Sequence, residues 1–188
     1  MPLPPIPDPA PVLPDLLAPG LRLVFCGSAP GAVSAARGAY YAHPGNRFWR
    51  ILHEAGLTPR RLAPAEYPLL LGFGIGLTDM AKHASGNDDE LPPDAYDPAA
   101  FAARIRAVRP AAVAFTAKAP AAAFLGRRTS ALAYGRTSGP ADFPPVWVLP
   151  STSGQASRFW DARPWHALGA WFHGATTEDP RHEPASRP

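Results

Sequence analysis

Cysteine is almost absent, since the chain of 188 residues holds only Cys26. A single cysteine excludes an intramolecular disulfide, a zinc site built from cysteines and a four-cysteine iron–sulfur cluster. The sequence also lacks an apolar run long enough to span a bilayer, and residues 1–14 lack the basic start and unbroken apolar stretch of a signal peptide. We therefore expect a cytoplasmic protein with no membrane partner.

Proline is concentrated at the ends of the chain. Residues 1–14 contain seven prolines, and residues 174–188 are polar with three more. Because neither end has the apolar side chains of a core, we predict a disordered proline-rich tail over 1–14, one domain over 15–173 and a disordered tail over 174–188. A domain of that length buries a substantial core without disulfide support.

Charge is modest in total but uneven along the chain. The formal net charge is +3, yet residues 79–97 hold six acidic residues against Lys82 alone, a local net charge of −5 that leaves +8 for the remainder. A basic body with one acidic segment suits an enzyme that binds a polyanion and keeps carboxylates for chemistry. A merely solvated surface would have the same composition.

Short apolar runs alternate with helix signals. Strands are predicted at 21–26, 74–78, 111–116 and 146–149, and helices at 47–55, 64–71, 98–109, 118–125 and 159–172. Asn46 and Asp97 precede helices as caps, Pro164 should break or kink the last helix, and residues 126–145 are predicted to be irregular. This alternation predicts an α/β fold, a three-layer α/β/α sandwich around a mostly parallel sheet.

Three unusual loops leave the predicted strand ends. They are a small-residue loop at 27–45 (the first loop), a carboxylate-rich loop at 78–91 (the acidic loop) and a serine-rich loop at 150–158 (the third loop). Ligands of parallel sheets bind beyond the carboxyl ends of the strands. We therefore expect the three loops to be the walls of one site.

Four strings in and around these loops identify a family. They are Gly27-Ser28-Ala29-Pro30-Gly31, Tyr40 to Trp49 with its His-Pro-Gly-Asn-Arg-Phe-Trp ending, Gly76-Leu77-Thr78-Asp79, and Leu149 to Gly154. In that order and spacing the chain resembles the mismatch-specific uracil-DNA glycosylase and thymine-DNA glycosylase family over about residues 17–172. The resemblance implies a uracil-DNA-glycosylase-like fold, no cofactor or metal, and a monomer that acts on DNA. The implied reaction hydrolyses the N-glycosidic bond of uracil or related bases and initiates base excision repair.

One departure from that family concerns the catalytic group. The family usually carries an asparagine that positions the attacking water, whereas Ala29 occupies the matching position here. Cleavage leaves positive charge on the sugar, so a carboxylate beside the sugar lowers the barrier. We predict that Asp88 supplies it, with Gly86 allowing the backbone to bend; Asp89 and Asp79 are the alternatives.

The resemblance also assigns residues to the base and to DNA. Tyr41 would stack on the extruded base, with Tyr40 as the alternative, while Ser28, Ala29 and Ser34 would line the base pocket. The wedge that enters or lines the minor groove would consist of Ser153, Gly154, Gln155, Ala156, Ser157 and Arg158. No large apolar side chain stands at the tip of this loop. We therefore expect weak opposite-strand discrimination and activity on single-stranded DNA as well as on G:U mismatches.

Two other functions remain open at this point. A non-catalytic mismatch- or damage-binding protein would keep the fold and the DNA groove but would have lost turnover together with the asparagine. A nucleoside or nucleotide hydrolase would use the same pocket for a free small molecule. His43 and Asn46 are interpreted as structural, since no second metal ligand accompanies His43 and Asn46 stands where a helix cap is expected.

Overall fold

The core of the fold is a five-stranded sheet in the order β2-β1-β3-β5-β4. The structure is a computed structural model that describes residues 10–92 and 94–174. The strands are β1 (Leu23–Gly27), β2 (Ile75–Asp79), β3 (Val113–Phe115), β4 (Gly135–Thr137) and β5 (Val146–Val148). All neighbours pair in parallel except β4, which runs antiparallel to β5 at the sheet edge. This confirms the predicted mostly parallel sheet.

The four parallel strands are buried along their whole length, as expected for a sheet covered on both faces. Short apolar runs of this kind were recognisable in the sequence, whereas β4 was not. The segment 126–145 was predicted to be irregular, and that prediction is wrong for β4. Because β4 has three residues, is half-exposed and carries Arg136, it has no apolar pattern to recognise.

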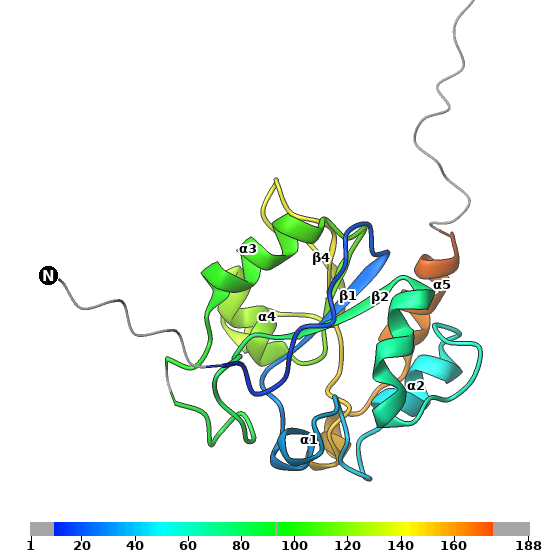
Figure 1. The fold of residues 1–188 in the computed structure, drawn as a ribbon. Coiled ribbons are helices and arrows are strands. Elements are labelled where there is room, and N and C mark those ends of the chain that lie inside the picture. The colour runs from blue at the N-terminus through cyan, green and yellow to red at the C-terminus, as the bar shows by residue number, and fades with distance from the viewer. Residues whose placement is uncertain (1–9, 93, 175–188) are drawn as a thin grey trace, which may run out of the picture.

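Helices cover both faces of the sheet (Figure 1). They are α1 (Ala32–Arg37), α2 (Phe48–Glu54), α3 (Pro98–Val108), α4 (Lys118–Leu125), α5 (Arg163–Gly174) and the 3-10 segments η1 (Pro64–Phe73), η2 (Thr129–Ala131) and η3 (Gly154–Phe159). Leu23 and Phe25 of β1 pack with α2, α5 and η1, while Val24 and Cys26 pack with α3 and α4. This alternation gives the predicted three-layer α/β/α sandwich.

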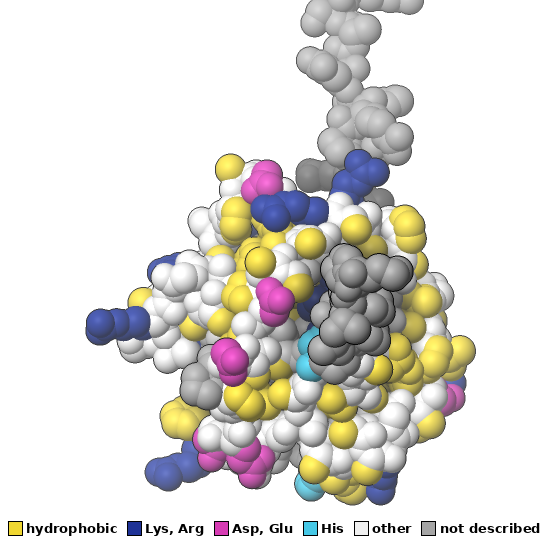
Figure 2. Space-filling view, turned by 60° about the vertical axis from the view of Figure 1, so that its left-hand side comes forward, with side chains coloured by type: hydrophobic (Ala, Val, Ile, Leu, Met, Phe, Trp, Pro, Cys, Tyr) yellow, Lys and Arg dark blue, Asp and Glu magenta, His cyan; other side chains and the backbone are white. Residues whose placement is uncertain are grey.

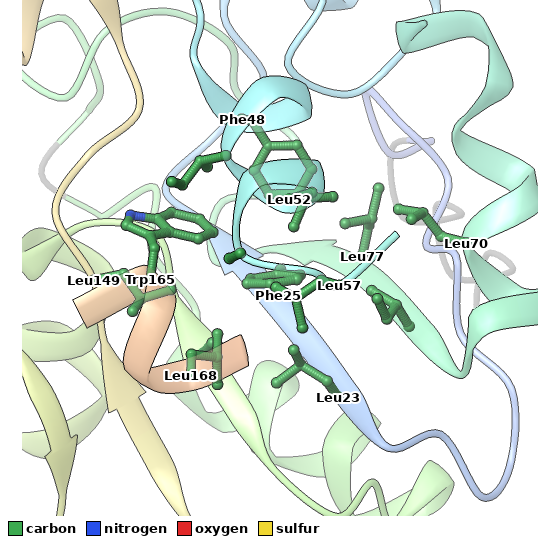
Figure 3. Packing of buried hydrophobic residues seen from close by; sticks show 14 of the residues in the cluster. Leu23, Phe25, Phe48, Leu52, Leu57, Leu70, Leu77, Leu149, Trp165 and Leu168 are labelled. Carbon is green, nitrogen blue, oxygen red and sulfur yellow. The ribbon is translucent and has the colours of Figure 1, made fainter. Parts of the chain in front are cut away.

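Aromatic rings join β1 to the helices on one face. The Phe25 ring lies 5.4 Å from Phe48 of α2 in an edge-to-face arrangement and 5.6 Å from Trp165 of α5 in a stacked one. Figure 3 shows these rings turned toward one another, with Leu52 and Leu168 nearby. Pairs of this geometry are worth about 0.5–1.5 kcal/mol beyond the area they bury. They tie α2, and the first loop before it, to the central strand.

The predicted helix caps are present, but the last helix begins later than expected. Asp97 accepts a hydrogen bond from the Ala100 amide at 2.8 Å, and Asn46 accepts one from the Phe48 amide at 3.0 Å. The predicted helix over 159–172 is replaced by η3 and by α5, which starts at Arg163. Pro164 is then the second residue of α5, where no amide hydrogen is needed, so it causes no kink.

A short helix also occupies part of the first loop, where none was predicted. Helix α1 follows Gly31 and ends at Gly38, which has a left-handed backbone with φ of 61°. Three of its six residues are alanine, and only Ser34 is buried. A helix with so little apolar surface has no periodic pattern in the sequence.

Residues from 10 onward pack against the domain. Leu13, which the sequence analysis placed in the proline-rich tail, is only 1% exposed and belongs to the core. Leu16 exchanges two backbone hydrogen bonds of 2.9 Å with Leu77 of β2. The assignment of residues 10–14 to a disordered tail is therefore wrong, because Leu13 has a place in the core that proline content did not reveal. The rest of the two predicted tails, 1–9 and 175–188, lies outside the described residues. Within the described part of the chain, no helix is both long and apolar enough to cross a membrane.

The packing of α5 on the end of α2 can be tested at Gly169. A Cβ atom at Gly169 would clash with the carbonyl oxygen of Ala55, which is backbone and cannot move alone. We expect Gly169→Ala to lower the free energy of unfolding by about 1–3 kcal/mol or more in urea titrations. Gly72→Ala is the matched control, since a Cβ there meets no heavy atom within 4 Å. Equal stability of the two variants would contradict this packing.

Candidate active site

The first, acidic and third loops meet at the carboxyl edge of the sheet. Gly27 at the end of β1 is in register with Asp79 at the end of β2. The amides of Met80 and Ala81 then donate to the carbonyl oxygens of Gly27 and Ser28 at 2.9 and 2.8 Å, so the first and acidic loops run side by side. The expectation that these two loops adjoin at this edge is thus confirmed, while their forming one site stays a prediction.

The third loop joins the same edge through the first loop. The Arg47 amide, two residues beyond the first loop, donates to the Thr152 carbonyl oxygen at 2.9 Å. A Cβ placed on Gly154 would lie 3.3 Å from the carbonyl oxygen of Gly45, so the two backbones pass close together. Figure 1 shows this part of the chain beside α1. All three loops therefore border one region.

The acidic loop turns sharply and docks on the first loop. Gly86 has a φ of 137°, a conformation that favours glycine, and its amide donates to the Pro30 carbonyl oxygen at 3.0 Å. The Glu90 side chain accepts from the Asn87 amide at 2.8 Å and so closes the turn that carries Asp88 and Asp89. The bend predicted at Gly86 is confirmed. Asp88 and Asp89 are both exposed on this turn.

Tyr96 connects Asp88 to the first loop. Burial raises the pKa of the Tyr96 hydroxyl to about 12; a hydrogen bond with Ser28 opposes this shift, and the charge and hydrogen bonding of Asp88 add to it. These directions are those of a phenol that accepts from Ser28 and donates to Asp88. The Tyr96 hydroxyl therefore interacts with both Ser28 and Asp88. Asp89 has no such contact to the first loop among the described interactions.

Tyr96 carried no signal in the sequence analysis. It stands six residues after Glu90, outside every string that resembles the family. An aromatic residue between an acidic loop and the cap of the next helix is a weak pattern, but it is the only signal that could have indicated this contact.

Tyr41 lies in the first loop, in the turn between α1 and α2. Its backbone has a φ of 51°, rare for a residue other than glycine, and its ring stacks on Phe48 with centroids 3.8 Å apart. Its hydroxyl lies 3.2 Å from the Thr116 hydroxyl. Burial raises the pKa of Tyr41 above its usual range. One face of the half-buried ring is covered by Phe48, and stacking of a base on the ring stays a prediction.

Tyr40 cannot take that role. It is only 2% exposed, and its hydroxyl donates to the Pro14 carbonyl oxygen at 3.1 Å. Its ring belongs to the core beneath the site. The alternative assignment of base stacking to Tyr40 is therefore wrong, because the Tyr40 side chain is buried, whereas that of its neighbour Tyr41 is partly exposed.

The three small residues predicted to line the base pocket differ in accessibility. Ser28 and Ala29 are half-buried at the end of β1. Ser34 is 6% exposed, and its hydroxyl accepts a hydrogen bond from the Ala42 amide at 3.0 Å. This bond holds α1 against the turn at Tyr41. Contact of any of the three with a base stays a prediction.

The third loop presents an apolar side chain that the sequence analysis missed. Gly154, Gln155, Ser157 and Arg158 are exposed and Ser153 and Ala156 half-buried, while Phe159 directly after them is 73% exposed. Phe159 was assigned to the final helix, and that assignment is wrong, because α5 begins only at Arg163. The cause is the late start of α5, which leaves Phe159 at the end of η3 and turned to solvent.

Asp79 lies beneath the site in a buried group of charges. It is 2% exposed, Lys82 Nζ lies 3.9 Å from its Oδ2, and this oxygen has no hydrogen-bond partner among the described residues. Lys82 pairs more closely with Asp15 at 2.7 Å, and Asp15 also pairs with Arg104 at 3.3 Å. Burial raises the pKa of Asp79 to about 7; the charge of Asp15 acts in the same direction, while Lys82, Arg104 and a hydrogen bond with Tyr40 oppose it.

A comparison with protein families shows to which superfamily the chain belongs. The family model of the uracil DNA glycosylase superfamily matches residues 14–173. The chain belongs to that superfamily. Membership supports DNA glycosylase chemistry, hydrolysis and a role in DNA repair in general terms, whereas the mismatch-specific branch rests on the sequence strings alone.

A solved structure supports the superfamily fold. The solution structure of a candidate uracil DNA glycosylase from Methanosarcina acetivorans is similar over 86% of this chain and 96% of that one, with a TM-score of 0.58 and 20% identity. At this identity the likeness concerns the fold, which is the α/β/α arrangement described above.

The superfamily fold places carboxylates, but no metal cluster, at this edge. Within residues 10–92 and 94–174, no three His, Cys, Asp or Glu side chains gather closely enough to hold a metal ion. On the face shown in Figure 2, acidic side chains lie beside a hydrophobic area, and Lys and Arg side chains project around its rim.

The buried state of Asp79 predicts a pH-dependent stability. Its pKa is about 7 in the folded protein against 3.8 for an ordinary aspartate, so the fold retains this proton after the unfolded chain has released it. The stability contributed by protonated Asp79 is fully present below about pH 4 and is lost as pH rises through about 7, with a slope of at most about 1.4 kcal/mol per pH unit. In Asp79→Asn this loss should be absent.

Urea titrations of both proteins between about pH 5 and pH 8 measure this effect. The stability of Asp79→Asn relative to the unsubstituted chain should rise with pH over that interval, whereas that of Asp89→Asn, an exposed control, should not. A constant difference for Asp79→Asn would show that this carboxyl is not retained as the neutral acid.

Proposed function

We propose that the protein is a monofunctional, mismatch-specific uracil-DNA glycosylase that removes uracil opposite guanine and works as a monomer. Membership of the superfamily supports the reaction class. The observation that carries the finer proposal is the contact of Asp88 with Ser28 through Tyr96. This contact supports a carboxylate acting near Ala29, the position where the resembling family has its water-positioning asparagine.

The chemistry requires a negative group on the sugar side of the bond. Water adds its oxygen to the anomeric carbon and passes one proton to the Asp88 carboxylate, the bond from that carbon to the base nitrogen breaks, and the base leaves with the electron pair and takes up a proton from solvent. Asp88 in its ionised form accepts a hydrogen bond from the water, orients it and offsets the positive charge that develops on the sugar. Ala29 has only a methyl group and contributes none of these interactions.

The base pocket lies between Tyr41 and the end of β1. The face of the Tyr41 ring opposite Phe48 stacks on the flipped base, an interaction that contributes about 1–3 kcal/mol per base in single-strand binding proteins. Ser28 and Ala29 border the base, and the small side chain of Ala29 leaves room beside it. Ser34 supports the pocket through its hydrogen bond to the Ala42 amide.

The third loop contacts the DNA from which the base is extruded. Residues 153–158 line the minor groove, and Phe159 fills the gap that the base leaves in the stack, as apolar wedges do in other proteins that kink DNA. Arg158 reaches a phosphate or a base edge. Phe159 also replaces our expectation of weak opposite-strand discrimination, since an apolar wedge senses the intact partner strand.

One alternative has an observation in its favour. Ala29 removes the usual water-positioning group, so a protein that binds mismatches or damage without turnover is the second candidate. Binding of a G:U duplex with no excision by the unsubstituted protein would favour this candidate over the glycosylase.

The catalytic assignment can be tested with Asp88→Asn. Loss of the charge that orients water and stabilises the sugar cation should lower the excision rate by about 100-fold or more. The assay incubates oligonucleotides holding uracil opposite guanine, opposite adenine or unpaired, then cleaves abasic sites with alkali. Asp89→Asn, on the same turn, is the matched control and should retain activity. Equal rates for Asp88→Asn and the unsubstituted protein would refute the assignment.

The wedge assignment can be tested with Phe159→Ala. Removing the ring should slow excision from a G:U duplex by about tenfold, because unstacking costs a few kcal/mol that the wedge no longer offsets. Excision from a single strand, where nothing has to be unstacked, should fall much less. The ratio of the two rates is the measurement, and an unchanged ratio contradicts the wedge role.

A further inference from the structure

We propose that Arg47 is a positioning residue that holds the third loop in its DNA-facing conformation and thereby sets the preference for duplex over single-stranded substrate. The inference rests on the proposed function of the third loop and assigns a role to the one cation in the His-Pro-Gly-Asn-Arg-Phe-Trp string. Arg47 acts through the loop and touches neither the base nor the sugar in this account.

The contacts of Arg47 reach both ends of the third loop. Its Nη1 donates to the Ser153 carbonyl oxygen at 3.4 Å, and its Nη2 donates to the Ser157 hydroxyl at 2.9 Å. Its backbone amide donates to the Thr152 carbonyl oxygen at 2.9 Å. Arg47 thus fixes the start of the loop at Thr152 through its backbone amide, and it fixes Ser153 and Ser157 through its guanidinium.

The guanidinium also rests on an aromatic ring anchored in the domain. The Arg47 guanidinium carbon lies 5.4 Å from the centroid of the Trp160 ring, within the range of a cation–π interaction. Trp160 is half-buried and packs against the larger core cluster. Arg47 therefore bridges a fixed ring at the end of the loop and the exposed residues before it.

The loop has few other means of keeping its shape. No residue of η3 is buried, and Ala156 departs from helical geometry in its middle. Its own hydrogen bonds are local, from the Gln155 amide to the Ser153 hydroxyl and from the Ser157 hydroxyl to the Gly154 carbonyl oxygen. Segments with little buried apolar area open at low free energy. Contacts from Arg47, outside the loop, therefore determine how often the loop keeps the conformation that exposes Phe159 to the DNA.

The holder is itself rigid. Arg47 immediately precedes α2, whose Phe48 and Trp49 are 0% and 3% exposed, and Asn46 caps the first turn. Phe48 carries the Tyr41 ring on its face. The same short segment therefore positions the proposed base-stacking ring through Phe48 and the wedge through Arg47, so the distance between pocket and wedge is set by one rigid element.

All the described partners of this guanidinium are neutral. No carboxylate of residues 10–92 or 94–174 forms an ion pair with Arg47. What Arg47 provides is thus the planar fork and the stacking surface, which lysine lacks. Arg47→Lys keeps the charge near the DNA and removes the geometry, so it separates positioning from simple attraction to phosphate.

Two measurements on Arg47→Lys and Arg47→Ala test the proposal. Arg50→Ala, in helix α2 that follows Arg47, is the control. Arg50 is exposed and pairs with Glu54, so its loss removes a similar charge without touching the third loop. We expect the ratio of duplex to single-strand excision rates to fall about tenfold in both Arg47 variants, with the single-strand rate changed by less than about twofold. Arg50→Ala should leave the ratio unchanged.

The second measurement does not depend on activity. Trypsin cleavage of the native protein after exposed Arg158 should accelerate about tenfold in both Arg47 variants, because the loop opens more often. Thermal melting verifies that the variants are folded. If Arg47→Ala does not fold, the comparison is made with Arg47→Lys alone. An unchanged rate ratio with unchanged cleavage in folded Arg47→Lys overturns the inference. Absence of excision by the unsubstituted protein refutes the proposed function instead, and the cleavage rates still decide whether Arg47 holds the loop.

Discussion

The packing of Phe48 is the interaction on which the rest of the site depends. Its ring meets Phe25 of the central strand at 5.4 Å, Trp165 of α5 at 6.1 Å and Tyr41 of the first loop at 3.8 Å. These contacts join the sheet, one helical layer and the carboxyl edge in a single cluster. Because interiors are close-packed, a small change at this ring would be transmitted to both the base-stacking tyrosine and the segment that seats the third loop.

Electrostatics at the carboxyl edge divides the acidic residues into two kinds. Asp79 is buried among Asp15, Lys82 and Arg104 and belongs to the support of the site. Asp88 stands on an exposed turn and interacts with Tyr96, which also interacts with Ser28 of the first loop. The difference follows from position. A carboxyl at a strand end is covered by the layers of the fold, whereas one on a loop that crosses the edge keeps its charge available to a ligand.

The sequence predicted the elements whose pattern is strong. The buried run ending at Gly27 and the helix at 118–125 were recognisable because the first is continuously apolar and the second is rich in alanine and ends at Gly126. Strand β4 and helix α1 were missed, since each is short and buries almost nothing. The meeting of the three loops was predictable, because parallel strands end at one edge.

The finer parts of the site depended on contacts between distant residues. Arg47 and its partners Ser153 and Ser157 are more than 100 residues apart, and no local pattern connects them. Phe159 was misassigned because a helix start was placed four residues too early. The choice among Asp79, Asp88 and Asp89 depended on burial and on Tyr96, neither of which composition or spacing contains.

The bridge between Leu16 and Leu77 has a consequence for behaviour outside catalysis. β2 is an outer strand of the sheet, and the two 2.9 Å bonds to Leu16 occupy one pair of its outward amide and carbonyl groups. The segment before Leu16 lies over the same margin, where the Val12 amide donates to Lys82. Unprotected margins of this sort recruit strands from other molecules. The stretch from Val12 to Leu16 thus covers part of this edge strand and disfavours self-association by sheet extension.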